Sequence, residues 1–367
     1  MAPQDDDERW MRVAVEEARR GLGSTSPNPA VGAVLAVRGK IVATGFHRRA
    51  GAPHAEIECL RNFAAPIPSD ATLYVTLEPC STRGRTGPCT TALISAGVRH
   101  VVIGAVDPNP IHRGRGVQLL REAGLNVRVG LLADECNALN EAYNKWIETG
   151  LPFVIAKCGM SLDGRLTAPP NASRWITSAA ARRHAQQLRA RVDAILVGAE
   201  TIRADDPRLT VRGIAGAKQP WRVILSRSGR LRRNATVFTD RFADKTVVFR
   251  NKSLVAVLRE LGRREITSVL IEGGGEVLGA ALDAQLIDRV QMYLGPVLTG
   301  GPVIAFSGRG FASSQVAARL EDVRYEKIQQ DLCIRGRPVY RAPAKNPSNS
   351  RAGNLLNHQK LNQGSRK

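Results

Sequence analysis

The sequence predicts an α/β protein built from two different domains in series. The first observation is length, because 367 residues exceed one ordinary hydrophobic core and fit two domains. The second is an alternation of short β-branched runs with helical patterns, each stopped by glycine or a turn cluster. That alternation is typical of largely parallel sheets covered by helices. Since no segment repeats at a fixed period, we expect two unlike folds.

The first domain is expected to cover residues 1–150. Strand-like runs such as "AVGAVLAV", "ATLYVTL" and "VRHVVIGAV" alternate with the helical patterns "HAEIECLRNF", "CTTALISAG" and "GVQLLREAG". The pattern "ECNALNEAYNKWIETG" predicts one further helix that ends at Gly150, and Pro152 follows. A glycine followed by a proline is typical of a helix end and a linker, so the boundary is placed here.

The second domain is expected to cover residues 151–343. The strand-like runs are "PFVIAKCGMSLDGRL", "DAILVG", "WRVILS", "KTVVF" and "VQMYLGPVL", with "SAAARRHAQQLRARV" as a helix. The run "TSVLIEGGG" is a strand that opens a helix. Residues 344–367 contain no acidic residue and no apolar periodicity, which predicts a disordered basic tail.

Composition restricts the class of partner only in part. The net charge of +20 suits a nucleic-acid binder, an enzyme of phosphorylated small molecules, or a basic proteome. Aromatic residues make up only 5%, which weighs against a groove that stacks single-stranded bases. No apolar run approaches the roughly 18 residues of a membrane span, and the acidic start "MAPQDDDERW" is unlike a secretory signal. We therefore expect a cytoplasmic protein with no membrane partner.

One histidine and two cysteines of the first domain suggest a metal site. Six cysteines are too few for a disulfide framework in a chain of this length, so thiols or metal ligands are expected. The stretch "GAPHAEIECL" places His54 two residues before Glu56, and "LEPCSTRGRTGPC" carries Cys80 and Cys89. One histidine and two cysteines form a catalytic zinc set, because three protein ligands leave the fourth position for water.

The chemistry that fits this set is deamination. Zinc lowers the pKa of bound water, and a carboxylate that is not a ligand, Glu56, can carry the proton. Zinc deaminases carry His-x-Glu followed by Pro-Cys-x-x-Cys, whereas the spacing here is the wider Cys-x8-Cys. A closed structural zinc site is the alternative, but the motif supplies no fourth Cys or His. His54 and Glu56 alone could also simply open a surface helix.

These runs resemble the bifunctional riboflavin-biosynthesis deaminase/reductase family. The matching runs "TSPNPAVGAVL", "GFHRRAGAPHAE", "TLEPCS", "GRTGPC" and "VDPNP...GRG" cover most of residues 10–130. The resemblance implies a cytidine-deaminase-like three-layer domain with one zinc per chain held by His54, Cys80 and Cys89, and Glu56 as proton shuttle. It implies substrate contacts from Asn28, His47, Arg85 and Thr86.

Some of those contacts have plainer readings. From the residues alone, Asn28 in "SPNP" could equally be a turn residue, and Arg85 a solvated loop charge. The chain also departs from the family at Thr82, where a histidine is usual. That departure concerns a substrate contact and leaves the metal ligands unchanged.

The second half resembles the reductase part of the same family over roughly residues 152–305, with a fold similar to dihydrofolate reductase. The resemblance implies NADPH and reduction of a ribosyl group to a ribityl group. The implied cofactor-binding residues are Gly159, Trp175, Thr201, Asp205, Gly274, Gly275, Glu276, Val277, Leu278, Gly279 and Ala280. The implied sugar-phosphate contacts are Ser173, Arg189, Leu209, Arg212 and Glu272.

Proton handling in this half is assigned to Lys157 and Asp205, which are the titratable candidates. For Asp205 in "ADDPRL" a turn or N-cap role before Pro207 is the competing interpretation. The glycines of "VLIEGGGEVLGAAL" could likewise form only a tight turn, because the spaced G-x-G-x-x-G pattern is missing. The chain departs from the family at Ser226, where aspartate is usual, and at Glu200, where glycine is frequent.

The leading hypothesis is an enzyme with two sites. It would deaminate 2,5-diamino-6-(5-phosphoribosylamino)pyrimidin-4(3H)-one and then reduce the ribosyl chain with NADPH. The alternatives are a nucleic-acid base deaminase with an accessory domain, and a binding module whose zinc is only a scaffold. A dinucleotide site in the second half favours the first hypothesis, so we expect a small phosphorylated pyrimidine as partner and no nucleic acid. A homo-oligomer is possible.

Overall fold

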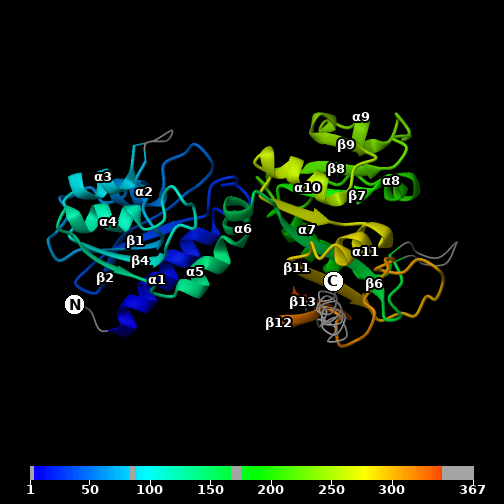
Figure 1. The fold of residues 1–367 in the computed structure, drawn as a ribbon. Helices are drawn as coiled ribbons and strands as arrows, with labels where there is room; N and C mark the ends of the chain where they lie inside the picture. The colour runs from blue at the N-terminus through cyan, green and yellow to red at the C-terminus, as the bar shows by residue number, and fades with distance from the viewer. Residues whose placement is uncertain (1–3, 83–86, 167–174, 341–367) are drawn as a thin grey trace, which may run out of the picture.

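A computed structural model describes residues 4–82, 87–166 and 175–340. They form two bodies that lie side by side, with α6 (Glu141–Thr149) close to the junction (Figure 1). The first body holds a five-stranded sheet and the second an eight-stranded sheet. The prediction of an α/β protein with two unlike folds is confirmed.

The sheet of the first body is mixed, with the strand order β2-β1-β3-β4-β5. Its strands are β1 (Gly32–Val37), β2 (Lys40–Phe46), β3 (Thr72–Leu77), β4 (His100–Ala105) and β5 (Asn126–Val129). Strand β1 pairs antiparallel with both β2 and β3, whereas β3, β4 and β5 are parallel. The expected parallel arrangement thus holds for the half of this sheet that follows β3, where each strand is followed by a helix.

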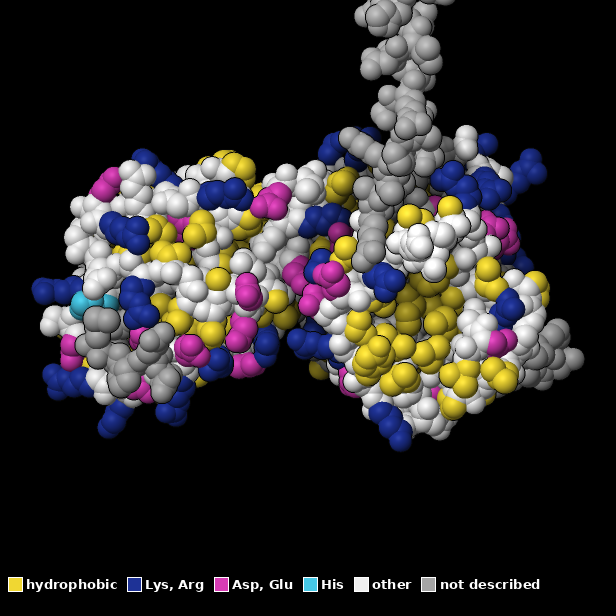
Figure 2. Space-filling view, turned by 60° about the horizontal axis from the view of Figure 1, so that its bottom comes forward, with side chains coloured by type: hydrophobic (Ala, Val, Ile, Leu, Met, Phe, Trp, Pro, Cys, Tyr) yellow, Lys and Arg dark blue, Asp and Glu magenta, His cyan; other side chains and the backbone are white. Residues whose placement is uncertain are grey.

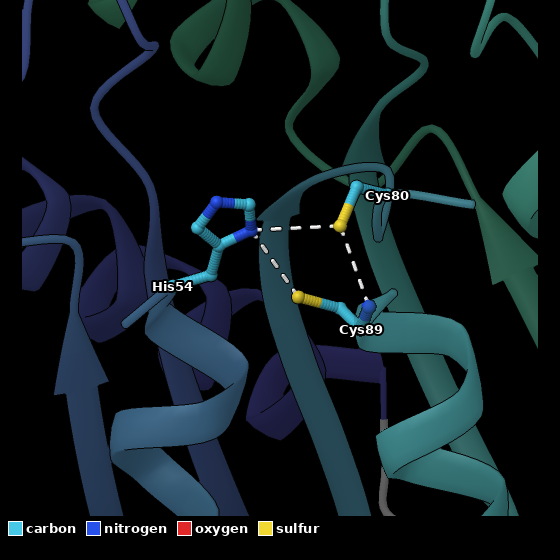
Figure 3. Close-up of side chains that lie close together, drawn as sticks. All are labelled: His54, Cys80 and Cys89. Carbon is cyan, nitrogen blue, oxygen red and sulfur yellow. Dashed lines mark hydrogen bonds between the residues drawn. The ribbon is translucent and has the colours of Figure 1, made fainter. Parts of the chain in front are cut away.

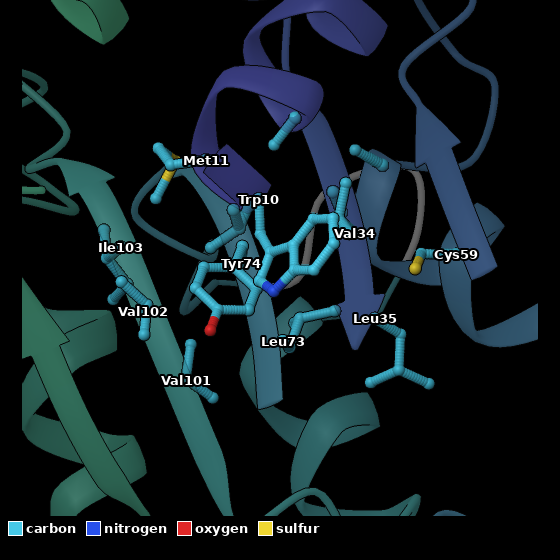
Figure 4. Packing of buried hydrophobic residues seen from close by; sticks show 14 of the residues in the cluster. Trp10, Met11, Val34, Leu35, Cys59, Leu73, Tyr74, Val101, Val102 and Ile103 are labelled. Carbon is cyan, nitrogen blue, oxygen red and sulfur yellow. The ribbon is translucent and has the colours of Figure 1, made fainter. Parts of the chain in front are cut away.

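Helices cover both faces of this sheet. They are α1 (Gln4–Arg19), α2 (Ala55–Arg61), α3 (Cys89–Ser95), α4 (Arg115–Glu122), α5 (Ala133–Leu139) and α6. Helices α2, α3 and α4 lie on one face, and α1 packs with α5 on the other. Trp10 and Met11 of α1 belong to one apolar cluster with Val34, Tyr74 and Val102 of the sheet (Figure 4), and the Tyr74 hydroxyl also donates to Asp7 of α1, so the apolar stripe of α1 closes this face of the core.

The second body has the strand order β12-β13-β11-β6-β10-β7-β8-β9. Its strands are β6 (Phe153–Ser161), β7 (Ala194–Gly198), β8 (Trp221–Ser226), β9 (Thr246–Arg250), β10 (Ser268–Ile271), β11 (Arg289–Gly295), β12 (Arg319–Ile328) and β13 (Asp331–Val339). The strands from β11 to β9 are parallel, and β13 and β12 add an antiparallel edge. The sequence reading did not anticipate β12 and β13.

Two apolar clusters lie on the faces of this second sheet. Its helices are α7 (Ala179–Arg189), α8 (Ala199–Asp205), α9 (Thr236–Thr239), α10 (Leu254–Arg263) and α11 (Gly275–Asp283), with a short 3-10 turn at Ala243–Lys245. One cluster joins Leu258 and Leu278 of α10 and α11 to the sheet, and the other joins Ile202 and Val237 of α8 and α9. Among the described residues, no helix is long and apolar enough to cross a membrane.

The glycines of α11 allow the chain at residues 304–308 to pack closely on the helix. A Cβ at Gly275 would lie 2.0 Å from the carbonyl oxygen of Ile304. A Cβ at Gly279 would lie 2.5 Å from the backbone nitrogen of Gly308. The expected strand-glycine-helix arrangement is therefore confirmed, and close packing explains why these two positions lack side chains.

Polar contacts join the two bodies. The Ser26 hydroxyl donates to the Asp193 carboxylate over 2.7 Å, and the Trp146 indole donates to the Gly262 carbonyl over 2.9 Å. Lys145 forms an ion pair with Asp288 at 2.5 Å. Each contact joins a residue before position 150 to one after it, so the sequence boundary near Gly150 is also a packed seam in space.

The prediction of a single helix that ends at Gly150 is wrong, because Asn140 separates two helices, α5 and α6. The Asn140 side-chain oxygen accepts from the Ala30 amide over 2.8 Å, and its amide donates to the Ala30 carbonyl over 2.9 Å. Asn140 thus pairs with one backbone residue as a neighbouring strand would. Because Ala30 is two residues from Asn28, the hydrogen bonds between Asn140 and Ala30 also hold the segment that contains Asn28.

We expect Asn140→Ala to lower the free energy of unfolding of the first domain by roughly 2–4 kcal/mol. The substitution leaves a buried backbone donor and acceptor at Ala30 without a partner. Urea unfolding followed by far-UV circular dichroism measures the change. Asn137→Ala, at an exposed position of α5, is the matched control. Equal stability losses in the two variants would contradict this role of Asn140.

Candidate functional site

A histidine and two cysteines meet at the start of two helices (Figure 3). His54 is the N-cap of α2, Cys89 is the first residue of α3, and Cys80 follows β3. The His54 Nδ1 lies 3.5 Å from the Cys80 sulfur and 3.3 Å from the Cys89 sulfur. A tetrahedral zinc ion holds its nitrogen and sulfur ligands about 3.6 Å apart. The three side chains therefore fit a zinc ion without rearrangement.

The environment of these groups favours anionic sulfur. Hydrogen bonds from Cys89 and His54 lower the pKa of the Cys80 thiol to about 4, although burial opposes the shift. Part of this effect comes from the Cys89 amide, which donates to the Cys80 sulfur over 3.3 Å at the start of α3. The hydrogen bond with Cys80 raises the pKa of Cys89, so one thiolate forms readily in the protein alone.

Glu56 lies in the first turn of α2 beside the three metal-binding candidates. It is 3% exposed, and burial raises the pKa of its carboxyl above the ordinary value. His54 opposes that rise through its charge. A carboxyl with these properties can hold a proton, which an exposed surface glutamate at neutral pH cannot.

His54, Cys80 and Glu56 border a cavity of about 390 Å³, and Cys89 contacts His54 from outside the lining. The remaining lining comes from both bodies: Pro27, Asn28, Pro29, Val31, His47, Ala50, Gly51, Ala52, Leu77, Glu78, Thr82, Asp107, Asn109, His112, Tyr143, Trp146, Ile147 and Glu265. Of the sequence-predicted substrate residues, Asn28 and His47 line this cavity. Arg85 and Thr86 lie outside the described residues.

His47 and Asn28 form a fixed pair in the wall of the cavity. The His47 Nδ1 lies 3.0 Å from the Pro53 carbonyl oxygen and must donate to it. Burial lowers the pKa of His47, so the ring is neutral and its Nε2 accepts from the Asn28 amide over 3.2 Å. The Asn28 carbonyl oxygen then remains for a ligand.

Glu78 is a residue that sequence reasoning missed, although it stands in the quoted run "TLEPCS". It is 4% exposed, and its carboxylate accepts four backbone hydrogen bonds from the segment that follows β4. The donors are the amides of Asp107, Gly114, Gly116 and Val117, at distances between 2.8 and 3.2 Å. The end of β3 thereby holds the loop that carries Asn109 and His112.

The second body supplies part of the wall of this cavity. Glu265 follows α10, and it lines the cavity together with Trp146 and Ile147 of α6. Glu265 has a left-handed backbone with φ +60°. No local sequence signal could have placed it here, because the two segments meet only across the seam between the bodies.

The second cavity, of about 810 Å³, lies in the eight-stranded body. Its lining is Lys157, Gly159, Leu166, Trp175, Ile176, Thr177, Arg182, Ala185, Gln186, Arg189, Thr201, Asp205, Asp206, Pro207, Arg208, Leu209, Arg212 and Glu272. Most sequence-predicted residues of this half are therefore brought together. Ser173 lies outside the described residues, and Arg182 and Arg208 are cations that sequence reasoning did not single out.

The predicted run from Gly274 to Ala280 does not itself line that cavity. Leu278 is fully buried in the core, and Gly279 packs against residues 307–308. The start of the run is nearer, since the Gly274 amide lies 3.4 Å from the hydroxyl oxygen of Thr201 in the cavity wall. Glu276 is exposed and forms an ion pair with Arg227 at 3.4 Å.

Glu272 is the centre of a buried charge cluster in the second cavity. Its carboxylate accepts two hydrogen bonds from the Arg189 guanidinium, each 2.7 Å long, and lies 3.7 Å from the Lys157 ammonium. Burial opposes ionisation of Glu272, yet Arg189 and Lys157 hold its pKa at about 2. Two cations and one anion leave a net positive wall, which suits an anionic ligand.

Asp205 and Asp206, at the end of α8, have different structural roles. Asp206 has a left-handed backbone with φ +40°, and its carboxylate accepts from the Thr236 amide and hydroxyl, both at 2.8 Å. Asp205 is the last residue of α8 and lines the second cavity. Leu209 has a different character from its neighbours, because it is 2% exposed and belongs to the core beneath the cavity.

Ser226 and Glu200, the two residues of this half that differ from the family pattern, do not contribute to the lining of the second cavity. The Ser226 hydroxyl accepts from the Gly229 amide over 2.9 Å at the end of β8. Glu200 is 81% exposed and pairs with Arg203 one turn later on α8.

Comparisons with known proteins agree with both halves. The family described as cytidine and deoxycytidylate deaminase zinc-binding region matches residues 4–105, and the family described as RibD C-terminal domain matches residues 152–334. The fold and the metal-binding geometry thus define a zinc-binding deaminase domain followed by a reductase domain.

Full-length relatives identify the family. The riboflavin biosynthesis protein RibD of Escherichia coli is 37% identical, over 89% of this chain and 98% of the relative. That of Mycobacterium tuberculosis is 41% identical, over 88% and 95%. The Acinetobacter baumannii RibD structure matches with a TM-score of 0.83 at 38% identity, covering 91% of this chain and 99% of that chain. This chain belongs to the RibD family of bifunctional deaminase/reductases of riboflavin biosynthesis.

We expect Arg189→Met to lower the free energy of unfolding by roughly 3–5 kcal/mol, because it strands the buried Glu272 carboxylate. The double variant Arg189→Met/Glu272→Gln should lose less. The depressed pKa of Glu272 stabilises the folded protein above pH about 4.5, and this contribution disappears as the pH falls towards about 2. Glu272→Gln should therefore lose less stability than wild type over that interval in urea unfolding.

Asp322→Asn provides the control for this acid series, because the Asp322–Arg337 pair is exposed on the antiparallel edge. It should follow the wild-type curve. If the stability of the wild type falls with pH no more than that of Glu272→Gln, the lowered pKa of Glu272 is contradicted.

Proposed function

We propose that this chain hydrolytically deaminates 2,5-diamino-6-(5-phosphoribosylamino)pyrimidin-4(3H)-one with zinc and then reduces the ribosyl chain of the product to ribityl with NADPH. The observation that carries the proposal is the cluster of His54, Cys80 and Cys89, of which His54 and Cys80 line one cavity together with the buried Glu56. A second cavity lined by five cationic side chains supports the reductase step.

In the first site, His54, Cys80 and Cys89 would hold the zinc ion. When bound, zinc lowers the pKa of a bound water from 15.7 to about 7 and so supplies hydroxide at neutral pH. Glu56 takes up the proton released there and delivers it to the pyrimidine ring nitrogen and the departing amine. Its raised pKa supports this role, because the carboxyl must hold the proton between the two transfers.

Asn28 and His47 would orient the pyrimidine. The neutral His47 ring fixes the Asn28 amide, which leaves the Asn28 carbonyl oxygen to accept from an exocyclic amino group. Arg85 and Thr86 are proposed as further substrate contacts on the strength of the family resemblance. In the sequence they stand between Cys80 and Cys89.

In the second site, NADPH would supply the hydride. We assign cofactor binding to Gly159, Trp175, Thr201, Asp205, Gly274, Gly275, Glu276, Val277, Leu278, Gly279 and Ala280. The contact between Gly274 and Thr201, which lines the second cavity, supports a place for the cofactor beside the start of α11. For the core residues Leu278 and Gly279 the support is indirect, through the position of the helix.

The sugar phosphate would bind at Ser173, Arg189, Leu209, Arg212 and Glu272. Arg189 and Arg212 supply positive charge, and Glu272 orients Arg189 through the two hydrogen bonds it accepts. Lys157 and Asp205 handle the proton that accompanies hydride transfer. Lys157 lies near Glu272 on the neighbouring strand, and Asp205 enters from the end of α8.

We infer that nucleic acid is not a substrate. Basic side chains on the face in Figure 2 are interspersed with acidic ones and do not gather into one stripe, as a nucleic-acid footprint would. The same view shows a broad apolar area on the second body, a kind of surface on which a second copy of the chain could pack.

Purified protein should contain about one zinc ion per chain. Cys89→Ser should lower the zinc content, because a neutral hydroxyl replaces a soft thiolate ligand. Metal analysis after gel filtration measures the content. Cys136→Ala alters another buried cysteine, remote from the cluster, and should retain the zinc. Full zinc occupancy in a Cys80→Ser/Cys89→Ser variant would disprove the ligand assignment.

Glu56→Gln should keep its zinc and lose deamination by roughly 10²–10⁴-fold, because an amide cannot carry the proton. It should still oxidise NADPH when given the deaminated ribosyl compound. Asp205→Asn should show the reverse and accumulate that compound while NADPH absorbance stays nearly constant. Glu58→Gln, on the same helix but outside the cavity lining, is the matched control for Glu56.

These measurements separate the two halves of the proposal. Near wild-type deamination by Glu56→Gln would reduce Glu56 to a helix-start residue. Near wild-type NADPH oxidation by Asp205→Asn would remove Asp205 from the catalytic residues. A loss of deamination in Asp205→Asn would contradict the independence of the two sites.

A further inference from the structure

His112 lines the first cavity and has no part in the proposed chemistry. It belongs to the loop after β4, whereas the neighbouring wall residues Cys80 and Thr82 follow β3. The His112 Nδ1 lies 3.5 Å from the Ser81 hydroxyl oxygen. Parallel neighbouring strands thus bring a histidine from one loop against the metal-binding loop of the other.

The backbone on both sides of His112 is fixed. Its amide donates to the Asn109 carbonyl over 2.9 Å, and its carbonyl accepts from the Arg115 amide over 2.8 Å. The flanking side chains lie elsewhere: Ile111 is 70% exposed, and the Arg113 guanidinium binds Glu148 at 3.0 Å. Of these three consecutive residues, His112 is the one that lines the cavity.

The charge of the cavity makes this histidine important. In the described part of the lining there is no lysine or arginine, whereas Glu56, Glu78, Asp107 and Glu265 are acidic. Glu78 is occupied by four backbone amides. Asp107 accepts from the Asn109 amide and the Tyr143 hydroxyl. A phosphorylated ligand therefore needs hydrogen-bond donors that these carboxylates do not provide.

The other two histidines of the cavity have other roles, since His47 holds Asn28 and His54 is a metal-ligand candidate. Both His47 nitrogens have partners, and the His54 Nδ1 faces the two cysteine sulfurs. His112 uses Nδ1 towards Ser81, which leaves its Nε2 for a ligand. Thr82 lines the same wall and carries no ring nitrogen.

We propose that the His112 Nε2 donates a hydrogen bond to the phosphate of the substrate's phosphoribosyl arm and thereby selects the phosphorylated pyrimidine over its dephosphorylated form. This inference rests on the proposed deaminase substrate. Glu78 is the positioning residue, because its four backbone hydrogen bonds hold the loop that presents His112. The residue that selects the phosphate then follows β4, whereas the metal-ligand candidate Cys80 follows β3.

Equilibrium binding to the zinc-loaded, full-length Glu56→Gln protein tests the proposal, since substrate is not consumed there. Titration calorimetry would compare the phosphorylated diaminopyrimidinone with the same compound lacking phosphate. Adding His112→Ala should weaken the phosphorylated ligand roughly tenfold or more and leave the other ligand unchanged. Adding Thr82→His to that variant should restore much of the affinity, because it returns an imidazole to the same wall.

His100→Ala, at the opposite end of β4, is the control and should bind both ligands as the parent does. Unchanged zinc content and NADPH oxidation would show that each variant is folded. Equal weakening of both ligands, or no weakening, would overturn the role of His112 and leave the proposed function intact. If the parent binds neither ligand, the proposed substrate is wrong and the His112 proposal fails with it.

Discussion

The deaminase site depends on the buried Glu78 carboxylate. The strands β3 and β4 are parallel neighbours, so the loops after them leave the same edge of the sheet. Loops that leave one edge can still diverge, and Glu78 prevents this through its hydrogen bonds to the second loop. Removing the carboxylate would leave four backbone amides, three of them buried, without this partner, so the geometry of both loops is tied to one side chain.

The second site also has a buried carboxylate at its centre, but its partners are charged side chains. Lys157 is on β6 and Glu272 follows the neighbouring strand β10, so the parallel pairing brings them to one edge. Arg189, the last residue of α7, completes the cluster from another element. One anion holds two cations there, whereas in the first site one anion holds a row of amides. In both sites a buried carboxylate holds together groups from separate elements of the fold.

The sequence predicted what is local and periodic. His54, Glu56, Cys80 and Cys89 stand at helix starts or strand ends within a short stretch, so their convergence could be inferred from residue types alone. Asn140 could not be recognised as a helix break, because its partner Ala30 is 110 residues away. Strands β12 and β13 were missed because β12 is mostly exposed and lacks an apolar face. Likewise, only the folded chain shows that His112 and Glu265 border the metal cavity.

The position of Glu265 changes how the two domains should be understood. The seam near Gly150 is tight, since a Cβ at Gly262 would lie 1.9 Å from the Gly150 carbonyl oxygen. Trp146 donates to the Gly262 carbonyl across this seam and also lines the deaminase cavity. Glu265, three residues after Gly262, lines the same wall. The reductase domain therefore shapes the deaminase cavity by direct contact. Since the seam and the cavity share Trp146, a shift of one domain against the other must alter the space in which the pyrimidine binds.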